Sequence, residues 1–161
     1  MGLFSFLARG HSRATPTHDR SSHRPDTAAA GTPGALSSGA ITIFGADKRI
    51  AALVPGTGVA VTALPYIIGR VPEDDEDVSR QPIGLFLRDD KPYRLSRRHF
   101  AIVRRDGEYW VLDGSSHLGT VVNGHTIGRK FGRDAATLQS GENQVVAGGP
   151  GSEYVFRIVL G

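Results

Sequence analysis

The sequence predicts an all-β domain, and three observations lead to that fold class. Gly accounts for 21 of the 161 residues, roughly twice the average usage, and so many glycines indicate many turns. From Ile41 onward, short apolar runs are separated by Gly, Pro, Asn and Asp. No segment shows a sustained helical period with caps. Many short strands at close spacing are typical of a β-sandwich.

The first 39 residues differ from the rest and form a basic tail rich in Ser, Thr, Pro and Gly. From His11 to Gly39 the only large apolar residue is Leu36, which cannot offset the entropy cost of ordering the segment. We therefore predict a disordered tail over residues 1–39 and one folded domain over residues 40–161. The tail histidines lack Cys or clustered carboxylates around them, so we expect no metal site there.

Within the folded part, ten segments combine apolar or β-branched residues with flanking turn residues. The predicted strands are Ile41–Phe44, Arg49–Val54, Val59–Leu64, Tyr66–Gly69, Ile83–Leu87, Phe100–Arg105, Glu108–Leu112, Thr120–Val122, Gln144–Ala147 and Glu153–Leu160.

Two tight turns and one alternating strand are the best-defined local features. Asp106-Gly107 and Asn123-Gly124 each lie between β-rich flanks, and both dipeptides favour type I′ hairpins. In the last strand, alternate residues from Tyr154 to Leu160 are apolar and share one face. Of the two aromatic residues after the first turn, we expect Trp110 to face the core.

Composition excludes several classes of function. Cys is absent, which excludes a disulfide framework, a cysteine zinc site and thiol catalysis. The net charge of +3 is small and aromatic residues are few, so we expect no nucleic-acid partner. No apolar stretch reaches the roughly 18 residues that span a bilayer. We therefore expect no integral membrane segment, a cytoplasmic location and no cofactor.

Charged residues cluster locally. The acidic run Glu73–Asp77 lacks the spacing and glycine of a calcium loop, so we interpret it as a solvated loop. Basic residues gather around residue 96, and Arg clusters are an established means of recognising phosphorylated and acidic peptides. We favour that role for Arg94, Arg97 and Arg98.

Three fragments are expected where strands meet loops. They are Ile68-Gly69-Arg70, the segment Leu95-Ser96-Arg97-Arg98-His99, and residues 113–124 with Gly119-Thr120 and Asn123-Gly124. A phosphate offers several strong acceptor oxygens at close to two charges. Arg supplies a planar fork of donors for it and Ser supplies a short neutral donor. Each fragment alone is weak evidence for a phosphate site, but the occurrence of all three in this order in one β-rich chain is specific.

Because the three fragments occur in this order, the sequence from Ile41 to Gly161 resembles the forkhead-associated (FHA) domain family. The resemblance implies a β-sandwich of about eleven strands whose loops at one end bind phosphothreonine peptides. It implies phosphate contacts for Arg70 and Ser96, and a peptide contact for Arg97. It also implies that a further group of residues braces the binding loops or serves their turns: Gly69, His99, Gly119, Thr120, Asn123 and Gly124.

The sequence departs from the family pattern at two adjacent positions. Leu118 stands where the family usually has an Asn that contacts the peptide backbone, and Leu has no donor, so peptide clamping would be weaker or different. His117 precedes it and could donate to phosphate when protonated. The acidic run is an insertion between Arg70 and Ser96, and its carboxylates would repel a phosphopeptide if they lay near the site.

The favoured hypothesis is a phosphothreonine-binding module, without catalysis, that acts as an adaptor in Ser/Thr-kinase signalling. The binding residues would be Arg70, Arg94, Ser96, Arg97, His117 and Leu118. The alternative is a scaffold or assembly subunit that binds an unphosphorylated protein. A hydrolase based on Ser96 and His99 is disfavoured because no motif supplies an orienting residue or an oxyanion site. The tail, which contains four Thr, is a further candidate partner once phosphorylated.

Overall fold

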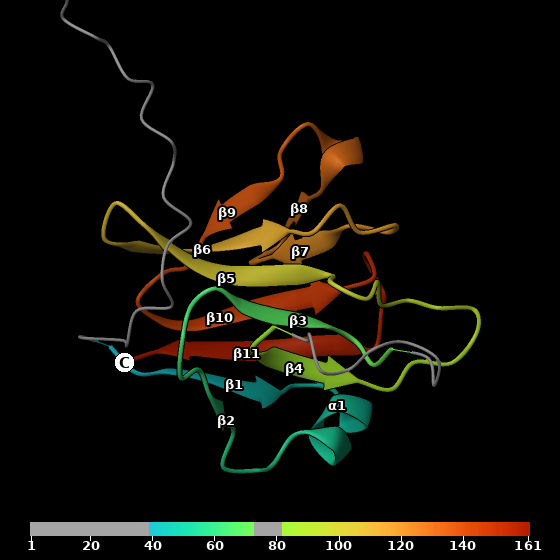
Figure 1. Cartoon of the computed structure of the whole chain (residues 1–161), viewed down its shortest axis with the longest axis horizontal. Helices are drawn as coiled ribbons and strands as arrows, with labels where there is room; N and C mark the ends of the chain where they lie inside the picture. Colours follow the sequence, from blue (N-terminus) through green and yellow to red (C-terminus); the bar gives the residue numbers. More distant parts are fainter. Residues whose placement is uncertain (1–38, 73–81) are drawn as a thin grey trace, which may run out of the picture. The chain divides into compact units, whose positions relative to one another are not determined.

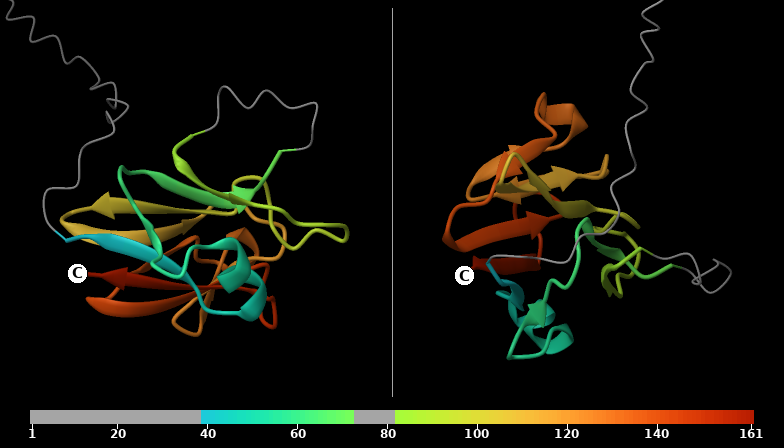
Figure 2. Two further views of the ribbon diagram at one scale, coloured as in Figure 1. Left: turned by 90° about the horizontal axis from the view of Figure 1, so that it is seen from below. Right: turned by 60° about the vertical axis from the view of Figure 1, so that its left-hand side comes forward.

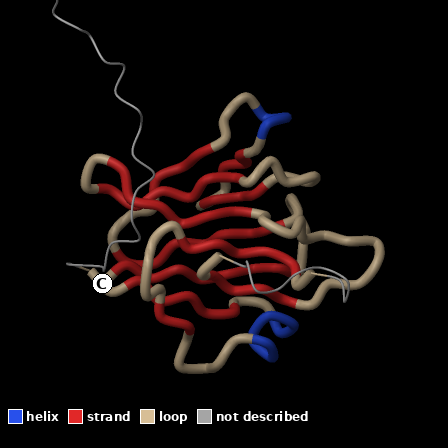
Figure 3. Tube along the Cα trace, in the orientation of Figure 1, coloured by secondary structure: helices blue, strands red, loops and turns tan. Residues whose placement is uncertain are grey.

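The computed structural model describes residues 39–72 and 82–161, and within them two β-sheets face each other (Figure 1). The acidic run Glu73–Asp77 and nearly all of the tail lie outside the described residues. One sheet has six strands in the order β2-β1-β11-β10-β7-β8, and the other has five in the order β4-β3-β5-β6-β9. Strands dominate the described residues (Figure 3), as predicted for an all-β fold.

The six-stranded sheet consists of β1 (Ile41–Gly45), β2 (Val59–Ala60), β7 (Thr120–Val122), β8 (His125–Ile127), β10 (Gly141–Ala147) and β11 (Tyr154–Leu160). The five-stranded sheet consists of β3 (Tyr66–Arg70), β4 (Gly84–Leu87), β5 (Phe100–Arg105), β6 (Glu108–Asp113) and β9 (Ala135–Thr137). Two short helices complete the described residues, α1 (Lys48–Leu53) and the 3-10 turn η2 (Arg129–Phe131).

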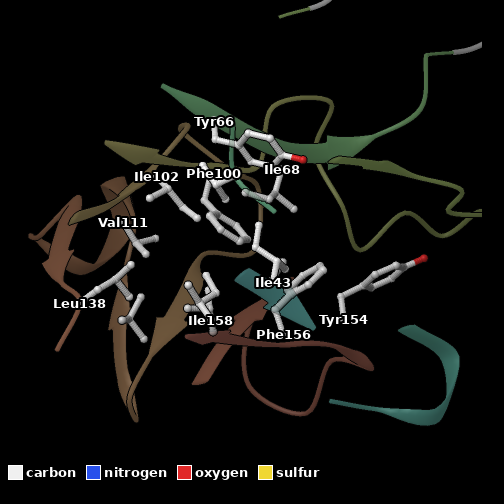
Figure 4. Packing of buried hydrophobic residues seen from close by; sticks show 14 of the residues in the cluster. Ile43, Tyr66, Ile68, Phe100, Ile102, Val111, Leu138, Tyr154, Phe156 and Ile158 are labelled. Atoms are coloured by element: carbon white, nitrogen blue, oxygen red, sulfur yellow. The ribbon is translucent and has the colours of Figure 1, made fainter. Parts of the chain in front are cut away.

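The hydrophobic core lies between the two sheets (Figure 2, left). Ile68, Phe100 and Ile102 point into it from the five-stranded sheet, and Phe156 and Ile158 from the other (Figure 4). The rings of Phe100 and Phe156 meet edge to face, with centroids 5.8 Å apart, a preferred geometry for aromatic pairs. The alternation predicted for the last strand is confirmed by the buried residues of β11.

Both predicted hairpin turns are present. Asp106 and Gly107 have φ of 51° and 85°, and Asn123 and Gly124 have φ of 49° and 84°. A type I′ turn needs positive φ at both central residues. The first turn joins β5 to β6 and the second joins β7 to β8.

The prediction of a strand over Arg49–Val54 was wrong, because this segment contains α1. Asp47 caps the helix, its Oδ1 accepting from the backbone N of Arg49 at 3.0 Å, which satisfies one of the unpaired first-turn donors. Ile50 is the buried residue of the helix. A helix of only six residues with a single buried residue has too little length to display a 3.6-residue period.

Other strands differ in extent from the prediction. β2 contains two residues, where Val59–Leu64 was predicted, and β9 was not predicted at all. Trp110 was expected in the core, but Tyr109 and Val111, its neighbours on β6, are the residues that contact the core. Because successive strand residues point to opposite faces, Trp110 lies on the outer face.

The connections between antiparallel strands place several loops at one end of the sandwich. We call it the His99 end, because His99 lies there, immediately before the first residue of β5. Strands β3, β4, β6, β8 and β10 finish there, and β5, β7, β9 and β11 start there. The two hairpin turns Asp106-Gly107 and Asn123-Gly124 lie at the opposite end. Neither helix among the described residues is long and apolar enough to cross a membrane.

Candidate functional site

A buried histidine lies where three loops meet at the His99 end. The side chain of His99 is fully buried, and its Nδ1 accepts a hydrogen bond from the backbone N of Ser96 at 3.0 Å. Its Nε2 lies 3.1 Å from the carbonyl oxygen of Gly119 and 3.0 Å from the backbone N of Gly148. A neutral ring with its proton on Nε2 accepts from Ser96 and donates to Gly119. The β4–β5 and β6–β7 loops are therefore held by one side chain. The β10–β11 loop joins them because the backbone N of Gly148 donates to the same carbonyl oxygen of Gly119 at 3.2 Å.

Burial lowers the pKa of His99, and this effect exceeds the opposing contributions from the Gly119 carbonyl, Asp113 and Asp89. Desolvation disfavours the charged imidazolium. The neutral ring is also the form that leaves Nδ1 able to accept from Ser96. Geometry and electrostatics thus favour the same protonation state.

Strand β3 passes unusually close to the segment that carries Ser96. The backbone N of Arg70 donates to the carbonyl oxygen of Ser96 at 3.0 Å. The backbone N of His99 donates to the carbonyl oxygen of Ile68 at 2.9 Å. A Cβ at position 69 would collide with the carbonyl oxygen of Arg97, so only glycine permits this approach. Gly69 therefore allows Arg70 and Ser96 to lie next to each other.

The guanidinium of Arg70 stacks on an aromatic ring that the sequence analysis did not single out. Its Cζ lies 3.9 Å from the centroid of Tyr93, within the range of a cation–π contact. Tyr93 belongs to the β4–β5 loop. The stack consequently ties the end of β3 to the loop that carries Ser96.

Asp89 holds the backbone of the β4–β5 loop. Its Oδ2 accepts from the backbone N of Arg94 at 2.7 Å and of Leu95 at 2.6 Å, while its Oδ1 accepts from the hydroxyl of Tyr154 at 2.7 Å. Burial raises the pKa of Tyr154 and the bond to Asp89 raises it further, so this hydroxyl remains a donor. The loop is thereby fixed to β11 in the opposite sheet.

Asp113 performs the same task for the β6–β7 loop. It accepts from the backbone N of Ser116 at 2.9 Å, from the Ser116 hydroxyl at 2.6 Å and from the Thr120 hydroxyl at 2.7 Å. The Ser116 Oγ in turn accepts from the N of Gly119 at 3.0 Å. Thr120 and Gly119 are thus positioned through one carboxylate at the end of β6.

The β6–β7 loop approaches Ser96 directly. The backbone N of His117 donates to the Oγ of Ser96 at 3.2 Å, and the His117 side chain is exposed. Leu118 is half-buried, and its carbonyl oxygen lies near Gly149 of the β10–β11 loop. The structure therefore gathers Arg70, Ser96, Arg97, His117 and Leu118 at one end, with Arg94 and Arg97 exposed beside them.

Asn123 and Gly124 lie at the opposite end of β7 from Thr120. The Asn123 amide donates to Asn143 Oδ1 at 2.9 Å, and its oxygen accepts from the backbone N of Gln144 at 2.9 Å. Asn123 therefore joins the β7–β8 turn to β10, away from Arg70 and Ser96.

Sequence reasoning missed Tyr93, Asp89 and Asp113 as residues that support this site. A local signal existed for Asp113, because an Asp followed by Gly-Ser-Ser favours a turn closed by the carboxylate. No local signal identified Tyr93, whose partner Arg70 is distant in the sequence, or the bond between Asp89 and the equally distant Tyr154.

This arrangement suits recognition of an anion rather than nucleophilic catalysis. Both ring nitrogens of His99 are engaged by backbone groups, so the ring cannot take a proton from the Ser96 hydroxyl as a general base would. Within residues 39–72 and 82–161, no three His, Cys, Asp or Glu side chains gather as a metal site would require.

Comparisons with known proteins agree with the geometry. Residues 66–143 match the family model described as the FHA domain. The chain is similar to FHA-1 of Mycobacterium tuberculosis Rv1747, with 16% identity, 78% of this chain and 99% of that chain covered, and a TM-score of 0.50. The chain is also similar to the FHA domain of CT664 from Chlamydia trachomatis, with 20% identity, 74% of this chain and 96% of that chain covered, and a TM-score of 0.49.

A third similar structure is Mycobacterium tuberculosis EmbR in complex with a low-affinity phosphopeptide. Its identity is 23%, the match covers 74% of this chain and 24% of that chain, and the TM-score is 0.48. No curated protein sequence matches the chain. The family match includes Arg70, Ser96 and His99, and the chain therefore contains a domain of the FHA family.

Proposed function

We propose that residues 40–161 bind phosphothreonine peptides and act, without catalysis, as a cytoplasmic adaptor in Ser/Thr-kinase signalling. The observation that carries this proposal is the direct backbone bond from Arg70 to Ser96, at 3.0 Å. It keeps the residues that carry a cationic fork and a hydroxyl next to each other at the end of the sandwich. Membership of the FHA family supports a recognition module rather than an enzyme.

The hydrogen bonds around Ser96 favour a donor role for its hydroxyl. The N–H of His117 already donates to Ser96 Oγ. A hydroxyl has two acceptor lone pairs and one proton to donate, so with one lone pair engaged the proton remains available for a phosphate oxygen. Arg70, stacked on Tyr93, would supply charge-assisted bonds to the same phosphate. Arg94, Arg97 and His117 would contact the flanking peptide.

Leu118 is the observation that favours a second candidate function, a scaffold that binds an unphosphorylated protein. Leu118 offers no side-chain donor to a peptide backbone and is half-buried beside Gly149. A phosphopeptide would lack this backbone clamp, whereas contact with the surface of an unphosphorylated protein does not require it. The two candidates therefore differ in whether removal of the phosphate abolishes binding.

Calorimetric titration of the full chain with phosphorylated and unphosphorylated forms of one threonine peptide pool tests the proposal. We expect binding of the phosphorylated pool at about micromolar Kd, or −8 kcal/mol, and none of the unphosphorylated pool. Arg70→Ala should weaken binding by at least about tenfold, since a hydrogen bond to a charged group contributes roughly 1.5–3 kcal/mol. Arg104→Ala, an exposed change on β5, is the matched control and should leave the Kd unchanged.

Equal binding of both pools would instead support the scaffold function. Binding of neither would contradict phosphothreonine recognition.

The tail is a second proposed source of phosphothreonine. It contains Thr15, Thr17, Thr27 and Thr32, and attachment to the domain would give an effective concentration on the order of mM. The tail-phosphorylated chain should then bind an external phosphopeptide more weakly than the unmodified chain. Equal affinities in the same titration would contradict self-binding.

A further inference from the structure

A basic loop that the proposed phosphate site does not use lies at the same end of the sandwich. The β8–β9 loop, residues 128–133, reads Gly-Arg-Lys-Phe-Gly-Arg. Arg129, Lys130 and Arg133 are exposed, and none of them forms an ion pair with a described carboxylate. Phe131 stands among them with 49% of its surface exposed. Isolated basic side chains around an exposed aromatic ring are typical of an interaction surface.

The loop is joined to the proposed phosphate site by consecutive contacts. The Nζ of Lys130 donates to the carbonyl oxygen of His117 at 3.1 Å, and the N of that same His117 donates to Ser96 Oγ at 3.2 Å. The Phe131 ring lies against Gly119, where an added Cβ would be 2.6 Å from Phe131 Cε2. In Figure 1 the loop includes the short orange helix that follows β8. One residue therefore separates the basic loop from Ser96.

A recess of about 550 Å³ separates the basic loop from the end of β6. Its lining includes Arg129, Arg133, Asp113 and Asp134. Asp113 already accepts three hydrogen bonds from Ser116 and Thr120, so its oxygens are largely occupied. Asp134 is exposed and adds one negative charge.

The presence of these two carboxylates distinguishes between possible anions. A nucleic acid presents phosphates at a short regular spacing, and some would face Asp134. An acidic peptide carries few carboxylates, and its apolar atoms can contact Phe131. Lys130 keeps two donor protons after its bond to His117, and the two Arg side chains offer forks that suit carboxylates.

On the basis of the proposed function, we propose that the β8–β9 basic loop binds acidic residues of the same phosphorylated partner, on one side of its phosphothreonine. The phosphate would provide the obligatory contact. The basic loop would then select partners whose phosphothreonine is followed or preceded by Glu or Asp.

The test compares three phosphothreonine peptides by calorimetry with the full chain: one with neutral flanks, one with Glu residues before and one with Glu residues after the phosphothreonine. We expect one acidic peptide to bind about tenfold more tightly than the neutral one, with the gain declining as salt rises from about 0.05 to about 0.5 M. In the double variant R129Q/R133Q that gain should disappear, while the Kd of the neutral peptide stays the same. Lys130 is left unchanged because it contacts His117.

The control R104Q/R105Q removes the same charge from exposed positions on β5, about 17–20 Å along the strand from His99, and should keep the full gain. No gain with either acidic peptide, or a gain that survives in R129Q/R133Q, would overturn the inference and leave phosphothreonine binding intact. Failure of all three peptides to bind would refute the proposed function and the inference together. A duplex oligonucleotide that binds more tightly than the acidic peptide, and loses this in R129Q/R133Q, would assign the loop to nucleic acid and overturn the inference.

Discussion

The two ends of the sandwich are closed in different ways. At the opposite end, Asp106-Gly107 and Asn123-Gly124 make tight turns with positive φ that continue the strand ladders. At the His99 end, the long β4–β5 and β6–β7 loops leave the ladders, and buried or half-buried side chains bond to their backbone instead. A short turn satisfies its backbone locally, whereas a long loop requires side chains as partners.

This difference predicts where substitutions act. Each bracing side chain at the His99 end satisfies several backbone groups, so its loss leaves several buried donors or acceptors unpaired, each costing roughly 1–3 kcal/mol. At the opposite end, a turn residue such as Gly107 contributes mainly its own backbone conformation, although Asn123 also bonds to Asn143 and Gln144 through its side chain. Changes at the His99 end should therefore disturb stability and binding together, and changes at the opposite end stability alone.

The largest effect is expected for His99→Ala. The substitution removes the acceptor for Ser96 N and the donor to Gly119, and it leaves a cavity among fully buried residues. We expect the free energy of unfolding to fall by about 4 kcal/mol, measured by urea denaturation. Phosphopeptide binding should also weaken in the protein that remains folded, because Ser96 loses its anchor.

The matched control is His125→Ala. His125 lies on β8 with an exposed side chain, so its removal should change stability by less than about 0.5 kcal/mol. Comparable losses for both histidines would refute the bracing role of His99.

Asp113→Ala should have the next largest effect. It removes the acceptor of three hydrogen bonds, and we expect a loss of about 3 kcal/mol in unfolding free energy. Glu108→Ala is the control, because Glu108 is an exposed carboxylate on the same strand. The amide protons of Ser116 and Gly119 should exchange faster in the Asp113 variant; unchanged protection there would contradict the assignment.

The contrast between the two ends also explains what the sequence could predict. Alternation from Tyr154 to Leu160 and the two turn dipeptides are local signals, and all are present in the structure. The helix α1 was predicted as a strand because it has only six residues. Its one cap and its one buried residue, Ile50, produce no helical period in the sequence. Strand β9 contains only Ala135, Ala136 and Thr137, and it exists because β6 offers an edge to pair with.

At the candidate site, Gly69, Arg70, Ser96 and His99 were identified by their order along the chain. Their supporting residues were not, since Tyr93 acts on Arg70 and Asp89 on Tyr154 only after the sheets have packed. Such partners belong to tertiary structure and leave no period or spacing in the sequence. That the motif residues lie together was thus predictable, whereas the side chains that position them were not.

The pH dependence of stability should come mainly from the His99 end. Because burial lowers the pKa of His99 in the folded protein, the unfolded chain binds a proton near pH 6.5 that the folded chain does not. The stabilising contribution is complete above pH of about 6.5 and is lost as pH falls toward the lowered pKa, by up to about 1.4 kcal/mol per pH unit. Urea denaturation at several pH values measures this slope, which should be smaller in His99→Gln; an equal slope in the variant would exclude His99 as its source.

The smallest effect is expected at the opposite end, for Gly107→Ala. Gly107 has φ of 85° and an added Cβ would meet no atom within 4 Å. The cost is therefore conformational only, about 1 kcal/mol for an L-residue in the left-handed region. Gly69→Ala, whose Cβ would collide with Arg97, should cost about 3 kcal/mol and weaken phosphopeptide binding, whereas Gly107→Ala should leave the Kd unchanged. Equal losses of stability or of affinity for the two glycines, measured by urea denaturation and calorimetry, would contradict the proposed division between the two ends. Both changes add the same methyl group, one into open space at a positive φ and the other against the carbonyl oxygen of Arg97.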